Sequence, residues 1–334
     1  MREGSRPFVL GVGPKGSVLP GSCGAVYTAA GVCVAAADLL LDVRDLRVEY
    51  ANGSRAVRGV RFEIRAGEVV GLLGESGCGK TSVALAVAGL LPRGARRSGT
   101  VALSGYEGRR ATVGFLFQEA GRTFHPFLSL GRQMREAARV GASGERVGRM
   151  AEEALEAVGL PAGEYAGAFP HQLSGGQLQR AQLAQVLVAE PAAIVADEPT
   201  AALDRAAEDQ VLDLIEGTRG KAGVLLISHE PELLRRRAGR VMVMYGGKIV
   251  ERGTAEQVFD APRHPYTQAL MACGKAGKTG GRVAEIPGQP PDPRGEQRGC
   301  SFAPRCAKRM AVCEEREPAA VDEANEVSCW AHGE

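Results

Sequence analysis

The segment GESGCGKT, residues 74–81, constrains the fold of this chain more than any other stretch of it. It follows AVRGVRFEIRAGEVVGLLG, residues 56–74, whose short apolar runs are typical of strands, and it precedes a largely apolar helix pattern that stops at Pro92. A strand, a glycine-rich loop and a helix in this order give the GxxxxGK[ST] pattern its structural context. An ordinary glycine-rich turn before a helix is the alternative. Strands and helices continue to alternate along the chain, which predicts an α/β fold with a largely parallel sheet.

The residue types of this loop suit a triphosphate. Glycines let successive backbone N–H groups point at phosphates, and the following helix adds its positive end. Lys80 supplies a positive charge to the β- and γ-phosphates, while the Thr81 hydroxyl is placed to bind Mg²⁺. The sequence therefore predicts an ATP site with Mg²⁺. Its residues here are Gly74, Glu75, Ser76, Gly77, Cys78, Gly79, Lys80, Thr81 and Ser82.

Cys78 lies inside this loop. Backbone dipoles there would favour the thiolate, so we expect alkylation of Cys78 to block nucleotide binding. A buried and inert thiol is the alternative.

Two adjacent carboxylates, Asp197 and Glu198, follow the apolar segment AAIVA, residues 192–196. Open α/β sheets bind ligands at the carboxyl ends of their strands. We expect Asp197 to hold Mg²⁺, directly or through water, and Glu198 to polarise the water that attacks the γ-phosphate. A general base contributes about 10² to 10⁴ in rate, so loss of Glu198 should abolish turnover and leave binding intact. A solvated acidic turn before Pro199 is the alternative.

The overall composition fits a soluble globular protein of 334 residues, with 44% hydrophobic and 24% charged residues. A net charge of +2 argues against non-specific binding of nucleic acid. No stretch approaches the roughly 18 apolar residues of a membrane span. Residues 1–38 imitate a secretory signal, but a nucleotide site needs cytosolic ATP. We therefore expect a flexible extension there, with a wrongly placed start codon as the alternative, and assign it no function.

The segment QLSGGQLQR, residues 172–180, precedes the carboxylate pair by about twenty residues. Ser174 can cap a helix opened by Gly175 and Gly176, which makes an anion site; a capped helix without a ligand is the alternative. With this segment, the chain resembles the ATP-binding cassette (ABC) ATPases. The resemblance implies a P-loop domain over residues 39–261, with a RecA-like mixed sheet, an antiparallel β part and an inserted helical subdomain at about 119–187.

The resemblance also implies roles for single residues. Tyr50 would stack on adenine, Gln118 would contact Mg²⁺ and the attacking water, and His229 would touch the γ-phosphate. A Tyr that only covers the sheet and a structural His are the alternatives. Residues 172–180, here called the signature segment, would receive the γ-phosphate of a nucleotide held by an opposite subunit. Two cassettes would therefore complete each site. The cross-subunit nucleotide contacts would come from Ser174, Gly175, Gly176, Gln177 and Asp204.

Three segments after the cassette carry a second resemblance. They are HPYTQAL (264–270), IPGQPPDP (286–293) and GCSFAPRC (299–306). Together they resemble the C-terminal extension of the oligopeptide, dipeptide and nickel importer ATPases, here residues 262–334. Because Pro, Gly and charged residues become frequent after Pro262, we expect this extension to have little regular structure of its own.

The extension contains Cys300, Cys306, Cys313 and Cys329, spaced Cx5Cx6Cx15C. This spacing lacks the paired CxxC of zinc ribbons. Four thiolates on loops are what a [4Fe-4S] cluster requires, and members with this tail resemble cluster binders. Arg305 and Lys308 would then offset the negative charge of the cluster. Zinc and unligated thiols are the alternatives.

The two resemblances together imply an ATP-hydrolysing subunit of an importer for peptides or similar small solutes, or for nickel. It would lie peripherally at the cytoplasmic face of the cell membrane. Its partners would be two transmembrane permease subunits, a second ABC ATPase, with a heterodimer favoured over a homodimer, and indirectly an extracytoplasmic solute-binding protein; nucleic acid is not among them. A soluble ABC ATPase outside transport and an exporter ATPase are the alternatives.

Overall fold

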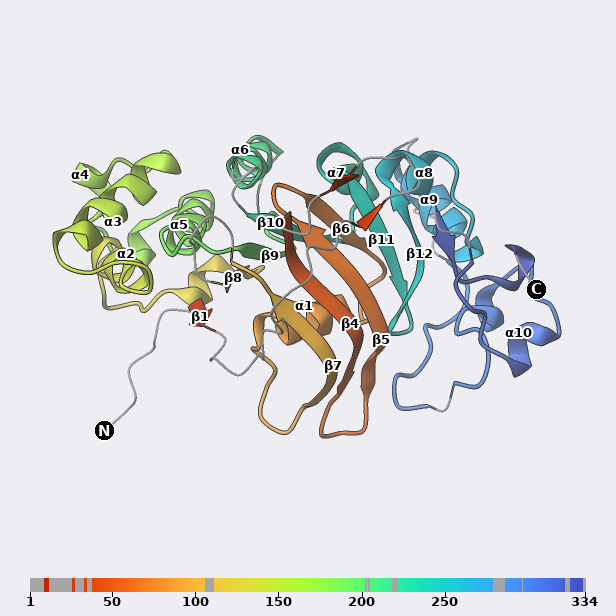
Figure 1. Ribbon diagram of the computed structural model, residues 1–334. Helices are drawn as coiled ribbons and strands as arrows, with labels where there is room; N and C mark the ends of the chain where they lie inside the picture. Colours follow the sequence, from red (N-terminus) through yellow and green to blue (C-terminus); the bar gives the residue numbers. More distant parts are fainter. Residues whose placement is uncertain are drawn as a thin grey trace. The chain divides into compact units, whose positions relative to one another are not determined.

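A computed structural model describes most of the chain. It covers residues 9–11, 26–27, 33–34, 38–105, 111–201, 203, 205–217, 222–278, 286–295, 297–321 and 325–332. The chain forms two compact units, each discontinuous in sequence. Unit 1 contains Met1–Asp42, Glu63–Glu68 and Ala102–Val224, and unit 2 contains Val43–Phe62, Val69–Val101 and Leu225–Glu334. Figure 1 follows the elements along the chain.

The strands of unit 1 centre on β8 (Thr112–Leu116). It pairs antiparallel with β1 (Val9–Gly11) and parallel with β9 (Ala193–Asp197). Every residue of β8 and β9 is buried, as expected for strands covered on both faces. Two short strands, β2 (Val26–Tyr27) and β3 (Cys33–Val34), pair with each other.

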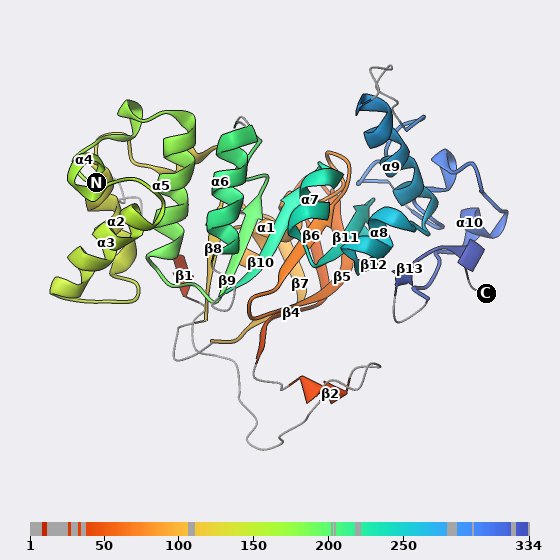
Figure 2. The ribbon, with the colours of Figure 1, turned by 90° about the horizontal axis from the view of Figure 1, so that it is seen from above.

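Four described helices of unit 1 lie between residues 130 and 187, and a fifth follows β9. α2 (Leu130–Ala138), α3 (Glu145–Ala157), α4 (Ala162–Tyr165) and α5 (Gly175–Leu187) lie together in Figures 1 and 2. Short 3₁₀ turns precede them and interrupt them at Ala120–Thr123 and Pro170–Gln172. α6 (Arg205–Glu216) follows β9.

The strands of unit 2 include the one that leads into the glycine-rich loop. β6 (Val69–Leu73) is completely buried and pairs parallel with β11 (Arg240–Tyr245). β11 pairs antiparallel with β12 (Lys248–Thr254), which pairs antiparallel with β13 (Glu326–Val327). The end of the tail therefore adds a strand to the sheet of this unit.

Three helices of unit 2 are adjacent to its strands in the sequence. α1 (Lys80–Ala88) follows β6, α7 (Pro231–Arg237) precedes β11, and α8 (Ala255–Asp260) follows β12. β10 (Gly223–Ser228) is buried along its whole length, and the unit boundary falls within it. The fold is thus α/β, as predicted.

A second, three-stranded sheet has the order β5–β4–β7. Its strands are β4 (Leu39–Glu49), β5 (Arg55–Arg65) and β7 (Arg96–Leu103). β5, with β6, corresponds to residues 56–74, whose apolar runs the sequence marks as strands before the loop. This sheet is the second β part that the ABC resemblance implies.

The tail contains more regular structure than predicted. α9 (Pro265–Lys278) is a helix of 14 residues, and Ala303–Arg305, Val312–Glu315 and Trp330–His332 form short helical turns. The expectation of an irregular tail was therefore wrong for α9. Its only proline stands at the first position, where a helix tolerates proline, and no further proline occurs before Pro287.

Candidate nucleotide-binding site

The loop between β6 and α1 depends on its glycines for packing as well as for conformation. Gly77 and Gly79 have φ angles of +80° and +112°, which L side chains rarely adopt. A Cβ on Gly79 would lie 2.2 Å from the Ala56 carbonyl oxygen, and one on Gly74 would lie 2.4 Å from the Met244 carbonyl oxygen. The backbone of the loop thus approaches its neighbours too closely for any side chain at these two positions.

Lys80 begins α1 and folds back over the loop. Its Nζ donates to the Gly74 carbonyl at 2.7 Å and to the Glu75 carbonyl at 3.0 Å. The residue is 6% exposed. A buried ammonium is costly unless it is hydrogen-bonded, so the loop provides a fixed location for one positive charge. Thr81, the next residue, is exposed.

Tyr50 lies close to the same helix. Its hydroxyl is 2.9 Å from the Ser82 hydroxyl, a hydrogen bond between the end of β4 and the first turn of α1. Tyr50 is half-buried. The tyrosine that the sequence singles out is therefore attached to the helix of the phosphate-binding loop.

Cys78 is buried in this loop, with 8% of the residue exposed. Desolvation raises the pKa of its thiol, and this outweighs the nearby Lys80 charge, which acts in the opposite direction. Backbone hydrogen bonds favour the thiolate, as expected, but desolvation outweighs them. The burial of Cys78 agrees with the alternative of a buried thiol.

The carboxylate pair lies at the end of β9 in unit 1. Asp197 is the last residue of the strand and is buried, while Glu198 is half-buried. Glu198 has a φ of +48°, a left-handed conformation that is uncommon for a non-glycine residue. Among the described residues, Asp45 and Glu190 share this conformation, so it makes Glu198 one of three candidates for a functional role on backbone grounds.

The signature segment forms the capped helix that the sequence predicts. Ser174 precedes α5, and its Oγ accepts from the Gln177 backbone N–H at 3.3 Å. Gln177 Oε1 accepts in return from the Ser174 N–H at 2.8 Å, which completes a capping box. Both Ser174 and Gly175 are exposed, so the start of α5 is accessible.

One hydrogen bond joins this helix to the loop after the carboxylates. Gln179 Nε2, on α5, donates to the Pro199 carbonyl at 2.5 Å. Gln179 is 5% exposed, so the contact is buried. The signature helix and the carboxylate loop are therefore in direct contact within unit 1.

The remaining predicted residues lie at the ends of strands. Gln118 follows β8 and is exposed in unit 1, and His229 follows β10 and is exposed in unit 2. Asp204 lies outside the described residues. The phosphate-binding loop, Tyr50 and His229 thus belong to unit 2, whereas Gln118, the carboxylates and Ser174 belong to unit 1.

The four tail cysteines do not form a metal site in the described part of the chain. No group of three or more His, Cys, Asp or Glu side chains among those residues has an arrangement able to hold a metal ion. Burial raises the pKa of Cys300 to about 11 and also raises the pKa of Cys329. The other tail thiols add to both shifts, so the four cysteines are neighbours. Neither the [4Fe-4S] ligation nor the zinc alternative is supported by this arrangement.

Two basic residues of the tail have partners other than those expected. Arg305 forms an ion pair with Glu75 at 2.7 Å, and Lys308 donates to the Gln268 side chain at 3.1 Å. Arg305 is therefore engaged by the loop, whereas the charge of Lys308 still lowers the pKa of Cys329. Sequence reasoning missed the link between Arg305 and the phosphate-binding loop, since nothing in the sequence relates residues 230 positions apart.

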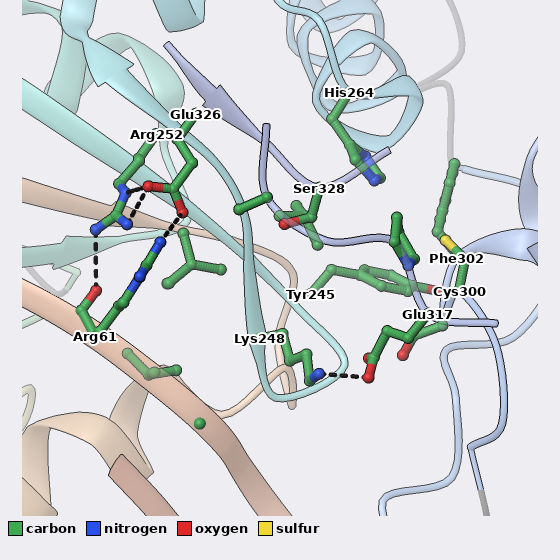
Figure 3. A pocket seen from close by; sticks show the side chains of 17 residues that line it. Arg61, Tyr245, Lys248, Arg252, His264, Cys300, Phe302, Glu317, Glu326 and Ser328 are labelled. Carbon is green, nitrogen blue, oxygen red and sulfur yellow. Dashed lines mark hydrogen bonds and ion pairs between the residues drawn. The ribbon is translucent and has the colours of Figure 1, made fainter. Parts of the chain in front are cut away.

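The tail is attached to the sheet of unit 2 around a pocket of about 340 Å³. Figure 3 shows Glu317 of the tail reaching Lys248 and Glu326 reaching Arg61 and Arg252. The Lys248–Glu317 ion pair measures 2.5 Å and the Arg61–Glu326 pair 3.1 Å. Charged pairs thus supplement the short β12–β13 pairing.

The strand, glycine loop and helix, together with the carboxylate strand and the capped helix, define an ATP-binding cassette ATPase. A family model described as ABC transporter matches residues 57–201. A second model, for the C-terminal region of oligopeptide and dipeptide transporters, matches residues 250–313.

Curated relatives cover nearly the whole chain. The chain is 36% identical over 324 residues to a probable peptide ABC transporter ATP-binding protein of Sinorhizobium fredii, an alignment that covers 89% of this chain and 96% of that protein. It is 34% identical over 323 residues to the dipeptide transport ATP-binding protein DppD of Bacillus subtilis, with 87% and 94% covered. The chain therefore belongs to the family of peptide-type ABC transporter ATP-binding proteins.

Solved structures support the same fold. The ATP-binding cassette MJ0796, in a dimeric post-hydrolysis state bound to ADP and Pi, matches with a TM-score of 0.54 and 25% identity, covering 65% of this chain and 99% of that one. CbiO1 of Clostridium perfringens matches with a TM-score of 0.57 and 24% identity over 67% and 92% of the two chains, and shows the fold alone. No helix within the described residues is long and apolar enough to cross a membrane.

Proposed function

We propose that this chain hydrolyses ATP to energise a membrane importer for peptides or similar small solutes. One combination carries the proposal: a phosphate-binding loop with a buried lysine, in a chain that aligns with peptide-transporter ATP-binding proteins through their C-terminal region. The cassette over residues 39–261 would supply the ATPase. The extension over residues 262–334 would mark the transporter type.

The loop residues bind the triphosphate in this proposal. Backbone N–H groups of the loop meet phosphate oxygens, and Lys80 transfers its hydrogen bonds from the Gly74 and Glu75 carbonyls to the β- and γ-phosphates. The oxygen donors of Thr81, Gln118 and Asp197 are of the type that Mg²⁺ prefers, so they fit the ion. Bound Mg²⁺ would neutralise charge on the phosphate oxygens.

Glu198 and His229 carry the chemistry in the same proposal. Glu198, which follows the buried Asp197 at the end of β9, accepts a proton from the attacking water. The exposed His229 contacts the γ-phosphate. Tyr50 stacks on the adenine.

Two cassettes complete each site. The accessible start of α5 at Ser174 offers N–H groups and a helix end to the γ-phosphate held by an opposite subunit. The solved MJ0796 cassette is described as a dimer with ADP and Pi, which supports this arrangement. The opposite subunit would be a homologous ATPase or a second copy, together with two permease subunits at the cytoplasmic face of the membrane and a solute-binding protein on the other side.

Vesicle transport tests the proposal. The chain would be reconstituted in vesicles with the permease subunits and the second ATPase that neighbouring genes encode. MgATP-dependent accumulation of labelled peptides would then be measured. Lys80→Ala should abolish both hydrolysis and accumulation, whereas Arg309→Lys, at an exposed tail position, should change neither. Export of peptide, or hydrolysis unaffected by Lys80→Ala, would contradict the proposal.

The iron–sulfur site stays a prediction from the resemblance and has its own test. Protein purified without oxygen would be analysed for iron and for visible absorbance. Iron bound at four atoms per chain and lost in a Cys306→Ser variant would support it. A colourless preparation without iron would remove it.

A further inference from the structure

Glu75, the second residue of the phosphate-binding loop, is held by a side chain of the tail. Arg305 Nη1 donates to Glu75 Oε2 at 2.7 Å, and Arg305 Nη2 donates to Glu75 Oε1 at 3.1 Å. Only 4% of the Arg305 side chain and 25% of the Glu75 side chain are exposed. Exposed ion pairs contribute little, but a shielded guanidinium fork on a carboxylate is both strong and directional.

Arg305 is itself fixed by three further hydrogen bonds. Its Nε donates to the Pro287 carbonyl at 3.0 Å, its Nη2 to the Ile286 carbonyl at 2.8 Å, and its Nη1 to the Tyr245 hydroxyl at 3.2 Å. All three guanidinium nitrogens are therefore engaged. A lysine has no planar fork and cannot reproduce this set of contacts.

The backbone of Glu75 is held by the same part of the tail. Its N–H donates to the Tyr266 hydroxyl at 2.8 Å, and Tyr266, on α9, is fully buried. The Tyr266 ring lies 4.5 Å from that of Tyr245 and 5.4 Å from that of Phe302, centroid to centroid. Figure 3 shows Tyr245 and Phe302 lying against each other beside the pocket. An aromatic cluster thus fixes the hydroxyl that binds the loop.

These contacts reach the lysine that would bind phosphate. The Glu75 carbonyl accepts from Lys80, while the Glu75 side chain and N–H are bound by Arg305 and Tyr266. Every polar group of Glu75 is therefore engaged, two by the tail and one by the lysine. A shift of Glu75 would move both the loop backbone and the resting position of Lys80.

We propose that Arg305 is a positioning residue for nucleotide binding, which holds Glu75 so that the phosphate-binding loop keeps the conformation that accepts MgATP. This inference rests on the proposed nucleotide site at residues 74–81. It gives the tail a direct effect on the affinity for nucleotide, and this effect does not depend on a metal bound by the tail cysteines.

A contact that only docks the tail would behave differently, and the chain offers a matched control. Glu317 also ties the tail to the sheet, through Lys248 at 2.5 Å and Arg58 at 3.3 Å, but it does not touch the loop. Glu317→Gln therefore weakens tail docking alone, whereas Arg305→Lys removes the fork on Glu75 and keeps the positive charge.

The experiment uses the full chain and measures the Kd for Mg–AMP-PNP by calorimetry, with KM and kcat for ATP hydrolysis. We expect Arg305→Lys to raise Kd and KM about tenfold and to leave kcat within about twofold. Glu75→Gln should act similarly, and the double variant should be little worse than either single one, because the two side chains act through one contact. Glu317→Gln should leave Kd within about twofold of the parent value.

Three results would overturn the inference. They are parent-like affinity in Arg305→Lys, equal weakening by Glu317→Gln, and additive effects in the double variant. If Arg305→Lys does not fold, Glu75→Gln carries the test, and parent-like affinity in that variant would also overturn it. A parent chain that does not bind Mg–AMP-PNP at all is a separate result, which removes the proposed nucleotide site itself.

Discussion

The phosphate-binding loop and the tail obtain their structures in different ways. In the loop, glycine positions decide the backbone, since Gly74 and Gly79 lie where a Cβ would collide with main-chain carbonyl oxygens. In the tail, a helix, short turns and one short strand are attached to the sheet through ion pairs and buried aromatic rings. The glycine positions of the loop can be read from the local sequence, whereas the attachment of the tail depends on residues distant in the sequence.

This difference also describes how the two regions serve one site. Lys80 and the glycines belong to the loop, but the tail provides the two groups, Arg305 and the Tyr266 hydroxyl, that hold Glu75. The motif supplies the phosphate ligands, and the tail stabilises the backbone on which they stand. The predictions below separate these two contributions.

The largest expected effect belongs to the motif side. Glu198→Gln should lower kcat for ATP hydrolysis by about 10² to 10⁴, because it removes the general base. Nucleotide affinity should stay near that of the parent. Steady-state hydrolysis and calorimetric binding on the same preparations would check this, and a variant with parent-like kcat would show that Glu198 is not the base.

The next effect concerns the tail and is a pH dependence of the free energy of unfolding. Desolvation, with a smaller contribution from His332, lowers the pKa of the buried His264 to about 4. An unfolded chain takes up this proton near pH 6.5, so the free energy of unfolding should fall between about pH 6.5 and 4, by up to about 3 kcal/mol. Above pH 6.5 this contribution is fully present.

Urea unfolding at pH 7.5 and at pH 5 measures this change in the free energy of unfolding. His264→Asn, which keeps an acceptor for the Tyr266 N–H, should lose less stability on acidification than the parent. His171→Asn, at an exposed histidine, is the control and should behave like the parent. Equal acid sensitivity in all three proteins would contradict the assignment.

Two glycines of the loop give a smaller and more local contrast. Gly77→Ala should cost about 1 kcal/mol, because its φ is positive but no atom lies within 4 Å of the added Cβ. Gly79→Ala should cost about 3 kcal/mol or more, because the Cβ also meets the Ala56 carbonyl. Equal unfolding free energies for the two variants would mean that packing does not dictate the loop.

The smallest effect concerns Cys78. Because burial raises the pKa of its thiol, maleimide should label Cys78 far more slowly than a solvent-exposed thiol, and Cys78→Ser should keep hydrolysis within about twofold of the parent. Mass spectrometry of partly labelled protein gives the relative rates. If Cys78 were labelled rapidly and ATP prevented the labelling, the hypothesis of a reactive thiol would be supported instead.

Much of the fold and of the loop was predictable, because the relevant signals are local. The strand before Gly74, the helix after Gly79 and the Ser174 cap all follow from residues within a few positions of one another. The tail was less predictable. The proline and glycine content of the tail as a whole predicted irregular structure and so concealed the helix α9. The contact of Arg305 with Glu75 spans 230 positions.

Cysteine spacing was the least reliable signal. The spacing of Cys300, Cys306, Cys313 and Cys329 states how many residues separate the thiols but not how their side chains point or how far they are desolvated. The side chains are neighbours without the arrangement of a metal site in the described part of the tail. Spacing therefore predicted proximity and did not establish ligation.

The measurement that tests the central claim most directly is equilibrium binding of MgATP to the full chain and to Lys80→Ala, in parallel with Glu198→Gln to prevent turnover. The account predicts saturable binding by the parent and by Glu198→Gln, and a loss of at least about tenfold in affinity for Lys80→Ala. Absence of binding by the parent, or equal affinity in Lys80→Ala, would contradict the claim that residues 74–81 hold the nucleotide.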